Sequence, residues 1–161
     1  MKIHPVSLKF IKEHGHLEAS FLREYLENSL VPMRLSLMLG CMFFAIFGIL
    51  DAVLIPEKKY VTWAIRYAVI CPAIVLVILG SYIRAIQAYI QPMISLLIIV
   101  AGVGIIAMII VAPPPVSYSY YAGLILIFMF GYTLLRTRFI WATGAGWVIV
   151  LLYEIAAFKY H

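Results

Sequence analysis

Three charged residues lie within or at the ends of long apolar stretches, and they are the strongest candidates for a functional role. They are Asp51, Arg66 and Glu154. A charge at the centre of a bilayer costs about 2.5–3.5 kcal/mol on insertion scales, so such residues are normally paired or line a polar site. Asp51 and Arg66 flank one short connection, and their side chains can pair if the two stretches are antiparallel helices. The three residues therefore suit either a structural ion pair with a Glu that reaches the membrane surface, or a polar pocket.

Aromatic residues are expected at the same depth as these charges. Residues of this type gather at membrane–water interfaces as an aromatic belt, and they can equally line a binding pocket. If the charges form a pocket, we expect its ligand-binding wall to include Trp63, Tyr118, Tyr120, Tyr121 and Tyr153.

Four arginines are expected at the opposite ends of the apolar stretches, where they would form a cytoplasmic basic ring. They are Arg34, Arg84, Arg136 and Arg138. Arginine at helix ends anchors the orientation of a membrane protein and contacts anionic lipid headgroups. We therefore assign these residues to topology and lipid contact.

The elements that must position these residues are five apolar stretches. A helix of about 20 residues spans the hydrocarbon core of a bilayer, and the stretches are 34–54, 63–82, 92–111, 117–135 and 139–158. The chain is 65% hydrophobic and 12% charged, whereas a soluble domain carries about 25% charged residues. The connections are short, which favours antiparallel neighbours. The sequence predicts an all-α, polytopic transmembrane helix bundle.

Three segments follow along the chain. Residues 1–16 are expected to be a polar, cytoplasmic N-terminus. Residues 17–33 alternate leucine and aromatic residues with charges at helical spacing, which predicts an amphipathic helix at the membrane interface that ends at Pro32. Residues 34–161 are expected to form the bundle, with close helix packing at small residues such as Gly102, Gly104 and Gly123.

Lysine and arginine counts predict the orientation. If the N-terminus is cytoplasmic, the inside segments carry Lys2, Lys9, Lys12, Arg23, Arg34, Arg84, Arg136 and Arg138, and the outside segments carry Lys58, Lys59, Arg66 and Lys159. Membrane proteins concentrate these residues in cytoplasmic segments. We therefore expect a multi-pass protein of a bacterial inner membrane with a cytoplasmic N-terminus, and the net charge of +5 does not require a nucleic-acid partner.

The sequence lacks the residue patterns that several kinds of catalytic and binding site require. The sequence contains no phosphate-binding glycine loop, and every histidine lies outside the apolar stretches. Cys41 and Cys71 fall inside the stretches and fit no metal spacing. The middle of the bundle, where transporters keep their sites, is apolar apart from small hydroxyls. We expect no active site, metal or cofactor in these residues, and we regard a transporter as a weaker interpretation.

Scattered strings of residues carry a resemblance to a known family. They are Phe-Gly-Ile-Leu-Asp at 47–51 followed by Pro56 and Glu57, Trp-Ala-Ile-Arg at 63–66 followed by Pro72, Tyr-Ser-Tyr-Tyr-Ala-Gly-Leu at 118–124, Tyr132 with Arg-Thr-Arg-Phe at 136–139, Gly146 with Trp147, and Tyr153 with Glu154. Over about residues 17–158 the chain resembles the N-terminal membrane module of bacterial membrane-anchored class III adenylate and guanylate cyclases. Similar modules precede other signalling outputs, such as diguanylate cyclases.

The resemblance implies six transmembrane helices, a cytoplasmic coupling helix and a catalytic domain. This sequence has five predicted spans and lacks the sixth helix and the cyclase domain, whose metal-binding aspartates would hold the activity. What the resemblance carries over is an input role without catalysis: a membrane anchor, a homodimerisation element and a sensor of a small extracytoplasmic or lipid-like ligand.

Three functions remain open at this point. The first is a sensor or anchor module that regulates a nucleotide cyclase and hence cAMP signalling. The second is a small transporter or channel, which needs a polar path through the bundle. The third is a structural or assembly membrane protein without a ligand. A pocket lined by Asp51, Arg66 and Glu154 favours the first, and three charges that face separate directions favour the third.

Overall fold

The chain forms an all-α helical bundle. The computed structural model describes the backbone of residues 15–114, 116–135 and 137–160, and the side chains of 28–114, 116–135 and 137–159. Within these ranges the regular elements are helices, with no strand among them. Five segments are long and apolar enough to cross a membrane, as predicted: Asn28–Leu54, Lys59–Gly80, Ile90–Val111, Val116–Leu134 and Phe139–Lys159.

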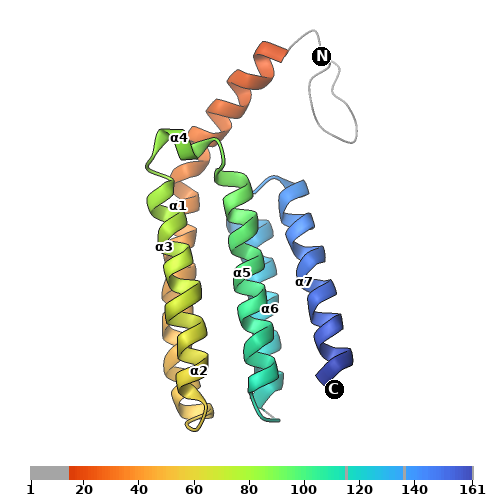
Figure 1. Ribbon diagram of the computed structural model, residues 1–161. Helices are drawn as coiled ribbons and strands as arrows, with labels where there is room; N and C mark the ends of the chain where they lie inside the picture. Colours follow the sequence, from red (N-terminus) through yellow and green to blue (C-terminus); the bar gives the residue numbers. More distant parts are fainter. Residues whose placement is uncertain (1–14, 115, 136, 161) are drawn as a thin grey trace.

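The five segments run up and down in sequence order, so their two ends alternate between the two faces of the bundle (Figure 1). The elements are α1 (Gly15–Leu54), α2 (Lys59–Trp63), η2 (Ala64–Ile70), α3 (Cys71–Gly80), α4 (Arg84–Gln87), α5 (Ile90–Val111), η3 (Val116–Tyr120), α6 (Tyr121–Met129), η4 (Phe130–Leu134) and α7 (Phe139–Tyr160). The second span is therefore α2, η2 and α3 joined end to end, and the fourth is η3, α6 and η4.

The first span does not begin where the sequence predicts. α1 is one helix of 40 residues that passes through Pro32, and the expected end of an interfacial helix at this proline is wrong. Proline removes one backbone donor, which frees the carbonyl of Asn28 four residues earlier, and membrane helices tolerate such an interruption. The Ser36 hydroxyl also donates to the carbonyl of Pro32 itself, at 2.8 Å. The N-terminal part of α1 extends past the other spans (Figure 1). Residues 1–14 lie outside the described residues, as do the side chains that would make 17–27 amphipathic.

α5 is the central helix of the bundle. In its most apolar stretch 61% of the residues are buried, against 33% or fewer in each of the other four spans. Gly102 of α5 permits close contact with α7, because a Cβ there would lie 2.6 Å from Ile149 side-chain atoms. Gly104 does the same against Ile70 of η2. The predicted role of these glycines in close packing is confirmed, and α5 holds the second and fifth spans in place.

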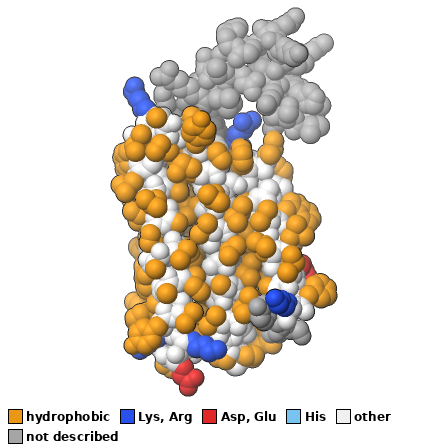
Figure 2. Space-filling model, in the orientation of Figure 1, with side chains coloured by type: hydrophobic (Ala, Val, Ile, Leu, Met, Phe, Trp, Pro, Cys, Tyr) orange, Lys and Arg blue, Asp and Glu red, His pale blue; other side chains and the backbone are white. Residues whose placement is uncertain are grey.

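The outer surface of the bundle suits a lipid bilayer. On the face in Figure 2, hydrophobic side chains cover the length of the spans, and charged ones lie near the two ends. Large apolar side chains are exposed on every span, for example Leu35 at 63%, Leu76 at 65% and Trp147 at 65%. Contiguous exposed apolar surface of this extent is typical of a membrane-facing exterior. The chain is a multi-pass membrane protein.

Candidate functional site

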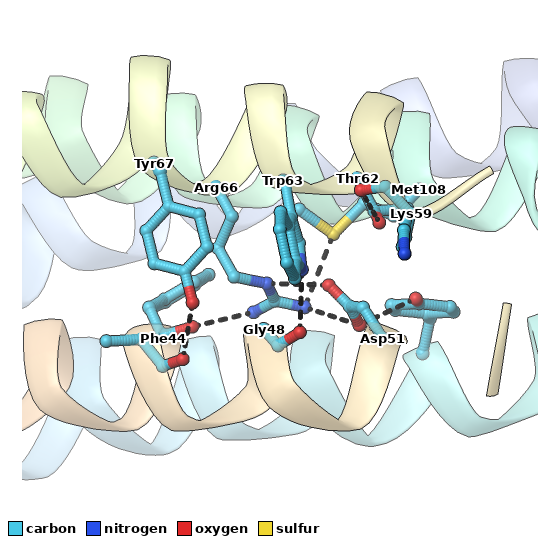
Figure 3. A network of polar contacts seen from close by, with 11 residues as sticks. Phe44, Gly48, Asp51, Lys59, Thr62, Trp63, Arg66, Tyr67 and Met108 are labelled. Atoms are coloured by element: carbon cyan, nitrogen blue, oxygen red, sulfur yellow. Dashed lines mark hydrogen bonds and ion pairs between the residues drawn. The ribbon is translucent and has the colours of Figure 1, made fainter. Parts of the chain in front are cut away.

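Arg66 is carried by a widened turn of the second span. η2 is a π-helix, and the Cys71 N–H bonds to the Arg66 carbonyl five residues earlier. The next residue is Pro72, which has no N–H to offer the carbonyl four residues before it, so the ordinary helical pattern cannot continue unbroken here. Single π-turns in helices recur at functional sites because they redirect side chains. The proline and the π-turn together position the Arg66 side chain, which points toward α1 (Figure 3).

Asp51 and Arg66 form a buried, two-pronged ion pair. The Arg66 Nε donates to Asp51 Oδ2 at 2.9 Å, and Nη2 donates to Oδ1 at 3.1 Å. Both residues are 3% exposed. A guanidinium matches a carboxylate in this geometry, which makes the pair both strong and directional. The pairing predicted from the sequence is confirmed, and the two charges neutralise each other within the bundle.

Further partners complete the coordination of both charges. The Tyr120 hydroxyl donates to Asp51 Oδ1 at 2.8 Å, so the fourth span joins the pair. The Arg66 Nη1 donates to the Phe44 carbonyl at 3.3 Å, and Nη2 lies 3.6 Å from the Met108 sulfur of α5. Four of the five spans therefore meet at this network of polar contacts. A buried charged group is tolerated only when its hydrogen bonds are satisfied, and here they are.

Two aromatic side chains fasten the second span to α1 on either side of Arg66. The Trp63 Nε1 donates to the Gly48 carbonyl at 2.7 Å, and the Tyr67 hydroxyl donates to the Ala45 carbonyl at 2.7 Å (Figure 3). A Cβ at Gly48 would collide with the end of the Tyr67 side chain, so the glycine lets this ring lie against α1. These contacts fix the depth of the second span against α1 and hence the register of the ion pair.

The ion pair lies at the polar end of an apolar cleft between α1 and α6. This cleft, which we call the Asp51 cleft, has a volume of about 130 Å³. Asp51, Arg66 and Tyr120 line it together with apolar residues, which are Phe44, Phe47, Leu50, Leu54, Ile105, Ala122, Gly123 and Leu126, and with Ser119. Phe47 and Leu50 are also exposed on the outer surface, at 40% and 48%. The cleft therefore opens sideways, toward the lipid.

The other predicted pocket residues do not join this network. Glu154 is exposed on α7 and makes no hydrogen bond or ion pair with the residues that the structure describes. Tyr118 stacks on Tyr121 at 6.3 Å, and Tyr121 meets Tyr153 edge to face at 5.7 Å, in a cluster beside α7. The expected single pocket thus divides into the Asp51 cleft, with Tyr120 alone of the predicted tyrosines, and a separate aromatic cluster.

The predicted basic ring also divides. The Arg34 guanidinium binds the end of the second span, donating to the Ser81 hydroxyl at 2.7 Å and to the Ser81 carbonyl at 2.6 Å, and it lies over the Tyr82 ring. Arg84 is exposed in α4 and Arg138 is half-buried before α7. Arg136 lies outside the described residues. Arg34 is therefore a helix-to-helix clamp.

Some residues of the site escape sequence reasoning. Phe44 contributes a backbone carbonyl, which residue type does not reveal, although its place two turns before Asp51 on one helix face is a usable signal. Met108 reads as an ordinary apolar residue of α5. The cleft itself arises from how α1 and α6 separate, which no local pattern encodes.

The arrangement is suited to binding and to holding helices in register. Asp51 and Arg66 saturate each other, and Ser119 and Tyr120 supply the other polar side chains of the Asp51 cleft. A ligand whose polar group competes for Tyr120 or Asp51 would alter contacts among α1, η2 and η3 at once. No known protein family, no curated protein and no solved structure matches this chain in comparison.

Proposed function

We propose that this chain is a membrane sensor and anchor module that regulates a nucleotide cyclase or a similar cytoplasmic signalling output. In this proposal the described residues carry no catalysis, and the output domain supplies the chemistry. The observation that carries the proposal is the Asp51–Arg66–Tyr120 network, which forms the polar end of a cleft open to lipid. A purely apolar bundle would not need such a network.

The ligand of the proposed sensor is lipid-like. Apolar side chains along the Asp51 cleft suit a hydrocarbon chain or ring, and one polar group at its end would reach the Asp51–Arg66 pair. Binding pockets combine an apolar lining with a few placed polar groups in this way. A ligand that enters sideways from the bilayer, near the extracytoplasmic ends of the spans, fits the opening between α1 and α6.

The orientation and assembly belong to the same proposal. The N-terminus is cytoplasmic in a bacterial inner membrane, because lysine and arginine favour the side that carries Arg34 and Arg84. The working form is a homodimer, because paired cyclase domains build their active sites at a shared interface. Signal transfer then requires a ligand-dependent change in how the spans pack.

The two other functions have less support. A transporter needs a polar path, but the cavity that continues the Asp51 cleft along α1 and α6 is about 60 Å³, and its lining is apolar apart from Ser36. A ligand-free structural protein accounts for the satisfied ion pair but leaves the cleft beside it without a role.

The reading frame that encodes the chain tests the output. We expect it to continue beyond His161 through a sixth apolar helix into a nucleotide cyclase domain, and membranes that hold its product to make cAMP or cGMP. A frame that closes directly after His161 would reject the cyclase output and leave a free-standing membrane protein.

A further inference from the structure

A second cavity lies between α5, the start of the fourth span and α7. Its volume is about 280 Å³, and it shares no lining residue with the Asp51 cleft. The short η3 segment separates the two: Ser119 and Tyr120 line the Asp51 cleft, whereas Ser117 and the adjoining Tyr121 line the second cavity. We call it the Ser117 cavity. It lies apart from the site of the proposed sensor function.

The size of side chains on α7 accounts for the space. α7 touches α5 closely where Ile149 meets Gly102. Two turns further along, α7 presents Ala156 and Ala157 to the cavity, whose short side chains leave the gap unfilled. Protein interiors normally contain few voids larger than a water molecule. The gap of about 280 Å³ opens to the outside beside the exposed Ile110 and Pro114, and it has room for a small guest.

Ser117 supplies a polar group without a partner at this gap. The residue is 2% exposed, and its hydroxyl oxygen has no hydrogen bond partner among the described residues. Leaving a buried hydroxyl unsatisfied is unfavourable, so an unpartnered one in a native structure indicates a missing bond to water or to a ligand. A hydroxyl both donates and accepts, so it can bind either a hydroxyl or a carbonyl group.

Water alone does not suit the cavity. At about 30 Å³ per molecule the space corresponds to about nine waters, each of which needs two to four polar partners. The wall offers the Ser117 hydroxyl and the hydroxyls of Tyr121 and Tyr153, and the remaining lining residues are apolar. A volume of about 150 Å³ is enough for benzene, so this cavity has room for a ring that also carries a polar group for its hydroxyls.

Tyr121 and Tyr153 favour a flat guest. Their rings meet edge to face, with centroids 5.7 Å apart and planes at 80°. Aromatic rings pair in offset or edge-on arrangements, so a third ring beside this pair gains both contact area and favourable electrostatics. We propose that the Ser117 cavity binds a small aromatic molecule with one hydroxyl or carbonyl group, which hydrogen bonds to Ser117.

Two matched probes test the proposal on the whole chain in detergent micelles. 4-Fluorophenol carries the hydroxyl and 4-fluorotoluene does not, and fluorine NMR titration measures the binding of each after subtraction of uptake by protein-free micelles. We expect saturable binding of 4-fluorophenol. Ser117→Ala should weaken it about three- to tenfold, the range expected for one hydrogen bond, and leave 4-fluorotoluene unchanged.

Variants of α7 test the location. Ala156→Phe fills the cavity and should abolish the binding of both probes, whereas Leu151→Phe, on the exposed side of the same helix, should bind as the unaltered chain does. Ser117→Ala should unfold at the same temperature or a higher one, since it removes an unpartnered hydroxyl. Uptake no greater than by empty micelles, an unchanged affinity in Ser117→Ala, or full binding to a folded Ala156→Phe chain would each overturn the proposal.

Discussion

At the scale of single residues, Tyr120 distinguishes this site from a simple ion pair between two helices. Asp51 and Arg66 would neutralise each other without it, because both carboxylate oxygens already accept from the guanidinium. The Tyr120 hydroxyl donates to Asp51 and so connects the ion pair to the fourth span. Tyr120, Asp51 and Arg66 all line the Asp51 cleft. In the proposed sensor, a ligand in the Asp51 cleft would act on the ion pair through this one hydrogen bond.

The first prediction concerns the buried pair. Asp51→Asn leaves the Arg66 charge uncompensated, and breaking a buried pair on one side typically costs about 3–5 kcal/mol. We expect a loss near that size in the free energy of unfolding, measured by denaturant titration in micelles.

Glu154→Gln is the matched control, because it also removes one carboxylate. Glu154 is exposed and has no bond to the described residues, so we expect a change within about 0.5 kcal/mol. Equal losses in the two variants would show that the Asp51–Arg66 pair contributes nothing special to stability.

At the scale of elements, the packing of α5 against α7 and of the second span against α1 positions both cavities. The close contact of α5 with α7 depends on Gly102. Because this residue has no side chain, the Ile149 side chain of α7 can pack directly against the backbone of α5. Ile149 is 1% exposed and cannot easily move. A change at this contact should therefore shift the helices or strain the core.

The second prediction tests that contact with two alanine substitutions. Gly102→Ala places a Cβ 2.6 Å from Ile149 and should lower the free energy of unfolding by about 1–3 kcal/mol, as overpacking does. Gly144→Ala, where no atom lies within 4 Å, should raise it by up to about 1 kcal/mol through helix propensity.

A second substitution checks the cause of the loss. Ile149→Ala removes Cδ1 and Cγ1, which both lie 2.6 Å from the added Cβ, and Cγ2 at 3.1 Å, so the double variant should lose less stability than the two single losses added together. The argument about close packing fails if the two glycine variants behave alike, or if the double variant is merely the sum of the single ones.

The sequence predicts the membrane-spanning helices better than it predicts where they begin and how they are rotated against one another. Length and hydropathy predict all five spans, and charges on consecutive antiparallel helices predict the Asp51–Arg66 contact. The same reasoning ended a helix at Pro32, because helix propensity in water overstates the cost of proline inside a membrane helix. It also placed Glu154 with the pair, because depth in the membrane is readable from sequence and helix rotation is not.

At the scale of the whole molecule, the five spans bury few of their side chains apart from those of α5 and expose many apolar ones. α5 is the buried centre, and the outward faces of α1 from residue 28 onward and of α7 are mostly apolar, with the exposed Glu154 on α7 as an exception. The Asp51 cleft and the Ser117 cavity lie on the two sides of η3, so one short segment contacts both sites. The orientation of this assembly decides which compartment each site faces.

The third prediction concerns that orientation. In a chain with Cys41→Ala and Cys71→Ala, a membrane-impermeant maleimide should label Glu57→Cys in intact cells and should label Arg84→Cys only after permeabilisation. Both positions are exposed, and they lie at opposite ends of the second span. The reverse pattern would contradict a cytoplasmic N-terminus and would place the Asp51 cleft near the inner surface.

The central claim is that the Asp51–Arg66–Tyr120 network controls a signalling output, and Tyr120→Phe tests it most directly. This change keeps the ion pair and the ring but removes the hydrogen bond, so it should cost only about 1 kcal/mol of stability. The measurement is cAMP and cGMP production by membranes that contain the product of the whole reading frame, with Tyr132→Phe, whose hydroxyl lies near Thr143 outside the cleft, as control. We predict that Tyr120→Phe changes nucleotide production severalfold while Tyr132→Phe does not. Equal production by both variants and the unaltered protein, or none by any of them, would contradict the account.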